Sequence, residues 1–514
     1  MGHTRPTTVS RRGFLKVGGA AAAGAALGVT TPWASPARVA AAGGVLRIGI
    51  PSDIQQIDPH LVSSAIDYTS MEAMFESLTT FDRNMNPVPS LAEKWEQPDS
   101  KTYVFTLRRG VKYHNGHEMK AADVKWSFER IIGFGGKSKW ASYLADVASV
   151  EPLDDYRVRV NLKNPSAPFL SSIRYAAIVS PEEEKNLATH PVGTGPFRFV
   201  ERVPNVHVKV ARFGDYWRKD LKYVDEIALS PVPEAQTAVA NLQAAVLDLH
   251  YNVPPKFKAE LSRLPNVRLY EPMPFATNYM LMLIRHAPPL DNVKVRQSLA
   301  MCTNRELIHR AAMFSVGEPG CSPFPKAHWA HSADVACLPF DRTKAKQLLK
   351  EAGHGDGLEL TLKASPQYPE FVRTAEIYEA QCREVGIRLK IQAIEWATYI
   401  KDLYGENNFQ LGESSVVREF DPDALTSGVF GTKASGNPGL YSNPRMDELL
   451  RMGRAELNRD KRKAIYKEIT QLAITDVPAI RQQTWPVLWG ATNKVKNLYI
   501  NALGRPNLLE IELG

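Results

Sequence analysis

Apolar and polar positions follow two different rhythms along the chain. In the first half, apolar residues alternate with polar ones in short runs such as 43–50, 103–107 and 158–162. A period of two is typical of strands with one buried face. Between these runs, residues 121–132 carry helical spacing, and Asp123 falls in the first turn, where a carboxylate is favourable. The first half is therefore expected to mix helices and strands.

The second half repeats a helix, a glycine and a strand. Helical spacing over 342–352 ends at a glycine and is followed by alternation over 358–362. The same order returns with a helix over 369–385 and a strand over 387–391. Units of this kind predict an α/β lobe of its own. The tail over 481–513 has strand-like pieces without this rhythm and could return to the first half.

The amino terminus has the organisation of an export signal. Residues 10–16 carry the arginine pair of a twin-arginine signal, an apolar run from Val17 to Val29 follows, and Ala40-Ala41-Ala42 has the form of an A-x-A cleavage site. The run is shorter than the ~20 apolar residues of a membrane-spanning helix. Because the first cysteine is Cys302, no lipid anchor can form near the cut. The sequence predicts a signal peptide over 1–42, cleaved near Ala42, and a periplasmic product that is not a lipoprotein.

Length and charge narrow the classes of function. The 514 residues exceed the size of a single hydrophobic core, so more than one domain is expected. The formal net charge is +8, but residues 1–42 hold five of the cations and no acid, which leaves the mature chain close to +3. This is too little to indicate binding to nucleic acid. A soluble protein that acts on small molecules fits better.

The four cysteines form two groups. Cys302 and Cys382 lie at helical spacing from apolar neighbours and are expected to be small buried side chains. Cys321 and Cys337 bracket a loop that contains proline and histidine. In an oxidising compartment they could form a disulfide, although the sequence leaves the pairing open.

Sequence motifs for catalysis or metal binding were sought and not found. The chain contains neither H-E-x-x-H nor G-x-S-x-G. One close histidine pair, His114 and His117, flanks an Asn-Gly turn signal and has no nearby cysteine or carboxylate cluster. The segment 193–196 lacks the third glycine of a dinucleotide loop and is expected to be a tight turn. No catalytic residue, no metal site and no cofactor is therefore expected.

Three blocks of motif residues lie in order along the chain. They are 90–95 with 103–111, 114–116 and 121–124; 191–197 with 215–217; and 292–299. Together they resemble the extracellular solute-binding proteins of family 5, the large periplasmic receptors of peptide, nickel and related ABC importers. The resemblance covers nearly the whole mature chain, and most of these residues are expected to be scaffold.

The resemblance implies a two-lobed α/β fold of the periplasmic-binding-protein type (type II, cluster C-like), with an extra subdomain in lobe one. Lobe one would comprise 43–275 together with 485–514, and lobe two 276–484. The chain would cross between the lobes near Phe275 and Thr484. A solute would lie between the lobes, which close over it by hinge motion.

The expected function is that of a monomeric, non-enzymatic receptor. It would deliver a peptide or a small, possibly anionic, organic solute to an ABC permease heterodimer in the inner membrane. Three alternatives stay open at this point. The first is a receptor for a metal chelate or haem, the second is an exported enzyme, and the third is a receptor that has become a periplasmic chaperone or chemotaxis sensor.

The resemblance also nominates residues around the Asp421-Pro422-Asp423 turn. Peptide receptors of this family hold the peptide amine with an Asp just before such a turn, and Arg418 or Glu419 takes that place here. Ser365 stands about where dipeptide receptors have an Arg for the carboxylate. If Arg418 faces the cleft, it suits a carboxylate or phosphate; alternatively, it pairs with Glu419 or Asp421 and orders the loop. If Glu419 points inward, an amine-binding role returns.

Aromatic residues complete the expected site. Trp396 matches an aromatic lining position of peptide receptors, where a flat ring packs on the ligand; ordinary core packing is the alternative. Tyr441 and Trp485 are further ligand-binding candidates. In lobe one, residues 52–57 follow the first strand and enter the cleft in relatives, and Ile54 is nominated from them.

Overall fold

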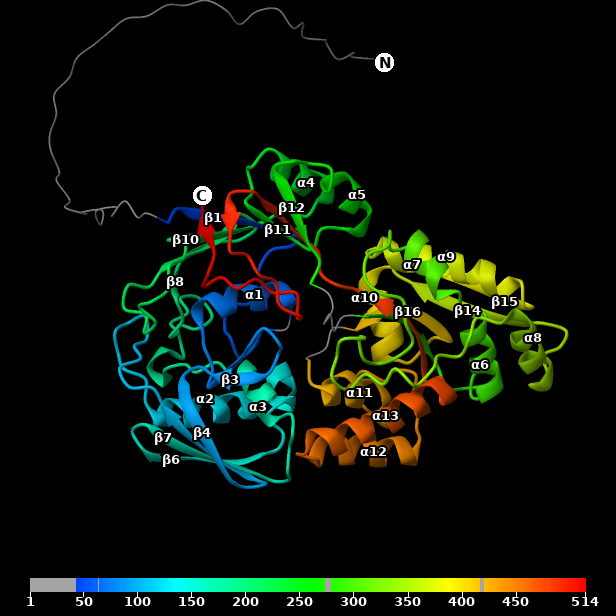
Figure 1. Cartoon of the computed structure of the whole chain (residues 1–514), viewed down its shortest axis with the longest axis horizontal. Helices are drawn as coiled ribbons and strands as arrows, with labels where there is room; N and C mark the ends of the chain where they lie inside the picture. The colour runs from blue at the N-terminus through cyan, green and yellow to red at the C-terminus, as the bar shows by residue number, and fades with distance from the viewer. Residues whose placement is uncertain (1–42, 63, 273–278, 417–419) are drawn as a thin grey trace, which may run out of the picture. The chain divides into compact units, whose positions relative to one another are not determined.

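The structure is a computed structural model that describes residues 43–62, 64–272, 279–416 and 420–514 (Figure 1). The expected signal peptide and its cleavage site at Ala42 lie outside the described residues and stay predictions. Among the described residues, no helix combines the length and the apolarity that crossing a bilayer requires.

A seven-stranded sheet organises the first part of the chain. Strand β1 (Val45–Ile50) runs parallel to both of its neighbours, and the alternation over 43–50 is confirmed by its burial. In spatial order the strands are β12 (Val267–Tyr270), β18 (Trp489–Thr492), β11 (Leu249–Tyr251), β1, β10 (Glu226–Pro231), β9 (His207–Arg212) and β8 (Phe197–Val203). Because β18 pairs with β11 and β12, the carboxyl tail returns to this sheet (Figure 1).

A four-stranded antiparallel sheet extends this part. Its strands are β4 (Ala92–Asp99), β5 (Thr102–Leu107), β7 (Arg157–Leu162) and β6 (Val147–Asp154), and helix α2 (Ala121–Gly133) packs on it. The predicted alternation is confirmed, because Tyr103, Phe105 and Leu107 are buried while their neighbours in β5 are half-exposed. The smaller elements here are α1 (Ala65–Met74), β2 (Thr79–Phe81), β3 (Pro87–Pro89), α3 (Phe169–Ser172), α4 (Ala235–Gln243), α5 (Lys258–Leu261), β19 (Val495–Lys496) and β20 (Glu512–Leu513). We call all of these elements the seven-stranded part.

A five-stranded sheet organises the other part, which we call the five-stranded part. In spatial order its strands are β15 (Ile387–Ala393), β14 (Leu358–Ala364), β16 (Leu411–Val416), β13 (Tyr279–Ile284) and β17 (Ala479–Thr484). Its helices are α6 (Val293–Met301), α7 (Arg305–Ala311), α8 (Arg342–Glu351), α9 (Pro369–Arg383), α10 (Trp396–Ile400), α11 (Pro422–Phe430), α12 (Pro444–Ala455) and α13 (Arg459–Asp476).

The predicted helix–glycine–strand units are present here. Helix α8 and strand β14 form one unit, and α9 and β15 form the next. Gly353 and Gly386, which follow these helices, have φ angles of +88° and +93°. Only glycine adopts this left-handed backbone without strain, so each helix ends where the sequence indicates.

The five-stranded sheet is covered on both faces. In β13, Met280, Met282 and Ile284 pack into one hydrophobic core, while Leu281 and Leu283 pack into another. Alternate residues of a strand point to opposite faces, so the strand is buried on both sides. Residues of α6, α8 and α9 fill the first core, and residues of α11, α12 and α13 fill the second (Figure 1).

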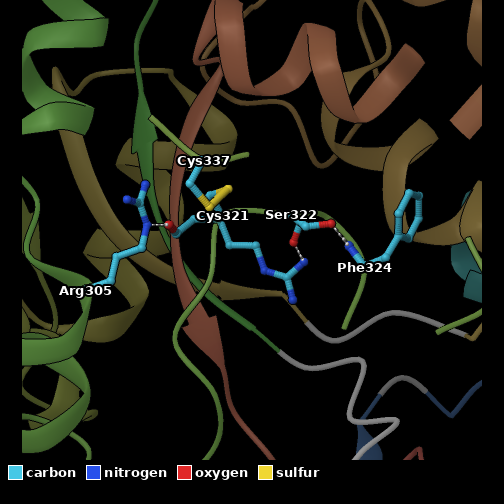
Figure 2. The surroundings of a disulfide bond; sticks show 6 residues. Arg305, Cys321, Ser322, Phe324 and Cys337 are labelled. Atoms are coloured by element: carbon cyan, nitrogen blue, oxygen red, sulfur yellow. Dashed lines mark hydrogen bonds between the residues drawn. A yellow bond between two sulfur atoms is a disulfide. The ribbon is translucent and has the colours of Figure 1, made fainter. Parts of the chain in front are cut away.

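Cys321 and Cys337 form a disulfide with an S–S distance of 2.02 Å (Figure 2). Next to it, the guanidinium of Arg481 donates a hydrogen bond to the carbonyl oxygen of Ser322. Arg305 Nε in turn donates to the carbonyl oxygen of Arg481 at 2.9 Å. The disulfide closes the loop after α7, and the hydrogen bond from Arg481 holds that loop beside strand β17. Cys302 and Cys382 are fully buried free thiols, as predicted.

Candidate functional site

A row of aromatic rings crosses the five-stranded part where strands end and helices begin. Trp396, the first residue of α10, is half-buried. Its ring centroid lies 5.0 Å from that of Tyr368 and 5.4 Å from that of Tyr399, on which it stacks. Tyr368 is also half-buried, so the two rings form a partly accessible apolar surface. Such a surface can pack on a ligand with little loss of rotamer freedom.

Trp485 lies at the other end of the same row. It follows β17, is half-buried, and its ring centroid lies 6.4 Å from that of Phe371. Phe371 in turn lies 5.1 Å from Tyr368. The structure therefore brings two of the predicted residues, Trp396 and Trp485, into one aromatic row through Phe371 and Tyr368.

Two other predicted residues lie in hydrophobic interiors. Tyr441 is 4 % exposed, and its hydroxyl donates a hydrogen bond to Asp476 Oδ2 at 2.7 Å. Ile54 is completely buried in the core of the seven-stranded part. Neither belongs to the aromatic row. Arg418 and Glu419 lie outside the described residues, so their orientation stays open.

The Asp421-Pro422-Asp423 turn is held by arginines of the same part. Asp421 caps α11 by accepting the N–H of Asp423 at 2.9 Å. Its two carboxylate oxygens also accept hydrogen bonds from Arg462, at 2.8 and 2.6 Å. This bidentate pair is largely buried. The sequence offers Arg418 as a partner of Asp421, but Arg462 is the arginine that pairs with it among the described residues.

Arg454, in α12, connects this turn to the seven-stranded part. Its Nη1 donates to Asp423 Oδ2, while its Nε and Nη2 lie 3.0 and 2.7 Å from Asp146 Oδ2. The carbonyl oxygen of Arg454 also accepts the N–H of Ala167 at 2.8 Å. Three hydrogen bonds from one residue thus join the two parts of the chain.

A cavity of about 450 Å³ lies beside this connection, and we call it the DP-turn cavity. The seven-stranded part lines it with Lys139, Ser142, Tyr143, Pro168, Ser171 and Ser172. The five-stranded part lines it with Asp421, Asp423, Ala424, Ser427, Gly428, Ser435 and Arg454. Small-molecule sites occupy roughly 300–1,000 Å³ and favour interfaces between domains, so this cavity has the size and the place of a solute site.

Ser365 offers no charge to a ligand. It follows β14 and is completely buried. Within the described residues, its hydroxyl oxygen has no hydrogen-bond partner. The cation that the resemblance leads one to expect near this position is therefore not supplied by Ser365.

Arg505 is a largely buried cation of the seven-stranded part that sequence reasoning missed. It lies in the tail between β19 and β20, and its guanidinium carbon sits 3.8 Å from the centroid of the Tyr68 ring. Burial raises the pKa of Tyr251 to about 12; the neighbouring Arg505 cation counteracts this shift, and Tyr368 adds to it. Tyr251 ends β11 in the seven-stranded part, whereas Tyr368 belongs to the aromatic row. No local pattern marks Arg505, and only the return of the tail to the first sheet could have indicated it.

The family motif residues form scaffold. The ring of His114 accepts the N–H of Gly193 at Nδ1, 3.2 Å away, and its Nε2 lies 3.0 Å from the carbonyl oxygen of Gly195. Burial lowers the pKa of His114 to about 4. A Cβ on Gly193 or Gly195 would stand 2.1 or 2.6 Å from the backbone of Met74. The predicted turns at 114–117 and 193–196 are therefore joined by hydrogen bonds, and glycine is needed at 193 and 195 because the second turn lies against the backbone of Met74.

A second motif block surrounds a buried acid. Glu76 accepts hydrogen bonds from the Tyr216 hydroxyl at 2.9 Å and from Trp217 Nε1 at 3.0 Å. Burial raises its pKa to about 7 although these bonds oppose the shift. No group of three or more histidine, cysteine, aspartate or glutamate side chains within the described ranges is arranged to hold a metal ion.

Comparison with known proteins gives consistent matches. The bacterial extracellular solute-binding proteins, family 5 (middle region), match residues 86–437, which is more than half of the chain. The glutathione-binding protein GsiB of Pectobacterium atrosepticum is 27% identical and covers 92% of this chain and 95% of its own length. The di/tripeptide-binding protein 1 of Pseudomonas aeruginosa is 27% identical and covers 89% of this chain and 92% of its own length.

A solved structure shows the same fold. The periplasmic binding protein DppA of Helicobacter pylori, in complex with the peptide STSA, superposes with a TM-score of 0.80 at 24% identity, covering 92% of this chain and 98% of DppA. The fold is therefore the two-lobed α/β fold of periplasmic binding proteins, as expected. The chain belongs to the bacterial extracellular solute-binding proteins of family 5.

Proposed function

We propose that this protein is the periplasmic receptor of an ABC importer and captures a peptide or small anionic organic solute between its two lobes. Lobe one would comprise 43–275 together with 485–514, and lobe two 276–484. The sheet order supports this division, since β18 belongs to the seven-stranded sheet and β17 to the five-stranded sheet. The relatives named for glutathione and for di- and tripeptides favour the same solute class.

The DP-turn cavity is the observation that carries the proposal. Side chains of both parts line it, so a solute that fills it would contact both lobes at once. Such a solute stabilises the closed arrangement by the difference between its affinities for the closed and open states. Trp396 and Tyr368 are not among the residues that line this cavity, and their half-buried rings offer a separate apolar surface of lobe two to a solute body.

Reversible capture requires no covalent chemistry. Family members are binding proteins, and the solute would leave this receptor unaltered. The protein would act as a monomer, be exported through its twin-arginine signal, and present the closed form to a heterodimeric permease in the inner membrane. Binding to nucleic acid is not part of this function.

Mass spectrometry of the native protein, followed by titration, tests the proposal. The chain is purified under mild conditions from a periplasmic extract, and the solute that it carries is identified. After stripping, that compound should bind again at one site per chain, and it should be recovered unchanged. Chemical conversion of the compound, or a chain that takes nothing from the extract, contradicts the proposal. Saturable binding of haem or of a nickel chelate in place of an organic solute favours the metal-chelate alternative.

A further inference from the structure

Two buried thiols of the five-stranded part lie in contact with each other. Cys302 follows helix α6, and Cys382 lies in the last turn of α9, 80 residues further along the chain. Their Sγ atoms are 3.2 Å apart, and both side chains are completely buried. A disulfide bond is ~2.0 Å long, so an approach of about 1.2 Å brings the two sulfur atoms to bonding distance.

Hydrogen bonds next to the thiols hold the two segments that carry them. The hydroxyl of Tyr378, one turn before Cys382 in α9, donates to the carbonyl oxygen of Leu299 in α6 at 2.9 Å. The side-chain oxygen of Gln381 accepts the backbone N–H of Asn304, just beyond α6, at 3.0 Å. The two sulfur atoms therefore keep their mutual position for as long as α6 and α9 stay packed together.

The two cysteine pairs differ in their exposure to solvent. Cys337 is exposed and Cys321 is half-buried, and this pair forms a disulfide. Cys302 and Cys382 are completely buried and reduced. Burial also raises the pKa of the Cys382 thiol well above its ordinary value, whereas thiol–disulfide exchange proceeds through a thiolate. While the fold is intact, an oxidant in solution therefore has no access to this pair.

We propose that Cys302 and Cys382 are the site of a second disulfide, which forms only when the five-stranded part unfolds in the presence of a small disulfide oxidant. One thiolate attacks the oxidant and releases its first thiol, and the other thiolate attacks the mixed disulfide and releases the second. Two protein thiols and one small disulfide thus give one protein disulfide and two small thiols. Refolding returns the two sulfur atoms to contact, which favours this pairing over one with Cys321 or Cys337.

The inference goes beyond the receptor function and does not depend on the solute. A chain that folds before it meets an oxidant keeps the buried dithiol. A chain that folds in the presence of the oxidant carries the bond between α6 and α9. The state of this pair therefore records whether folding came before or after the transfer to an oxidising compartment.

Thiol counting on the full mature chain tests the proposal. The chain is produced in a reducing cytoplasm, purified with dithiothreitol, freed of the reductant and divided in two. Oxidised glutathione is added to one half in its folded state, and the other half is unfolded in urea and refolded with the same oxidant. Both halves are then denatured in N-ethylmaleimide, and peptide mass spectrometry locates the alkylated and the linked cysteines.

The folded half should lose the thiols of Cys321 and Cys337 and keep those of Cys302 and Cys382 for alkylation. Oxidation of the buried pair should be at least ~100-fold slower in the folded chain than in the unfolded chain, because a buried group reacts only through rare opening of the fold. The refolded half should contain a peptide in which Cys302 and Cys382 are linked. The exposed pair is the matched control within the same molecule.

Two variants separate this pairing from mispairing. Cys321→Ser/Cys337→Ser retains only the buried thiols and should give the same linked peptide after oxidative refolding. When Cys382→Ser is added to this variant, Cys302 has no cysteine partner and should carry glutathione as a mixed disulfide instead.

Two results overturn the proposal. The first is a folded half without alkylated Cys302 and Cys382, which would mean that the fold does not shield them. The second is a refolded half in which these two cysteines stay reduced or pair with Cys321 or Cys337. If a variant fails to refold, the peptides of the wild-type chain decide by themselves.

Discussion

Arg454 and Asp146 lie 308 residues apart in the sequence and form an ion pair, with Arg454 Nη2 2.7 Å from Asp146 Oδ2. The arginine belongs to the proposed lobe two and the aspartate to the proposed lobe one. Both side chains are only partly exposed, at 33% and 19%, so water screens the pair less than a surface pair. Any separation of the lobes at this edge must break the pair. The ion pair therefore favours the closed arrangement of the lobes.

Asp146→Asn should weaken solute binding and preserve the fold. The substitution keeps the size of the side chain and removes its charge, and a partly exposed pair contributes about 1 kcal/mol, or roughly fivefold in affinity. Calorimetry with the co-purified solute measures the change. Asp154→Asn is the control, because Asp154 pairs with Arg157 inside the four-stranded sheet. Equal affinity of both variants and wild type would show that the pair has no part in closure.

Trp396→Ala should lower solute affinity by roughly 5- to 30-fold, because a half-buried ring that packs on a ligand contributes roughly 1–2 kcal/mol. Its melting temperature should fall by only a few degrees, because Tyr368 and Tyr399 retain their other contacts. Trp126→Ala, which removes a partly buried ring on the core of the seven-stranded part, serves as the comparison. A large loss of melting temperature with unchanged affinity would assign Trp396 to the core.

The stability of the chain should fall between pH 6.5 and 8. Burial raises the pKa of Glu413 from 4.5 to about 8, although the amide of Gln482 donates to its Oε1 at 2.8 Å. The folded state therefore binds a proton that the unfolded state has already released. The resulting loss is at most about 1.4 kcal/mol per pH unit up to the folded pKa, and it levels off above it. Glu76, with a pKa of about 7, adds to the loss at the lower end of this range.

Glu413→Gln should flatten this decrease in urea unfolding curves recorded from pH 6.5 to 8.5. Below pH 6.5 the buried His60 and His328 make the stability fall as the pH decreases, opposite to the effect of Glu413. Burial lowers their pKa values to about 4, so stability is lost as the pH falls below about 6.5. The exposed Glu448→Gln should leave the slope unchanged. An unaltered slope in Glu413→Gln would show that Glu413 is ionised in the folded state.

Removing the disulfide should destabilise lobe two. The Cys321–Cys337 bond closes a separation of 16 residues, for which the loss of closure entropy corresponds to about 3 kcal/mol. The melting temperature of Cys321→Ser/Cys337→Ser should therefore fall. Dithiothreitol should lower the melting temperature of wild type but not that of the double variant. A wild-type chain insensitive to the reductant and equal in stability to the double variant would contradict this role.

The local pattern of apolar and polar residues predicts many of the helices and strands, but it predicts few of the contacts that form the candidate site. The helices before Gly353 and Gly386 and the alternation in β1 and β5 depend on neighbouring residues, so the sequence predicts them. Trp396 and Trp485 were nominated separately, yet their common row passes through Phe371 and Tyr368, which no pattern marked. The position of Arg505 depends on the pairing of β18 with β11 and β12. This pairing joins segments that are distant in the sequence, and periodicity does not reveal it.

Small-angle X-ray scattering tests the central claim most directly. The mature chain is stripped of its solute, measured, and measured again after saturation with the compound identified by mass spectrometry. Closure of two lobes over that compound predicts a smaller radius of gyration in the loaded state and a return to the first curve when the solute is removed. Superimposable curves for the stripped and the loaded chain would contradict the account.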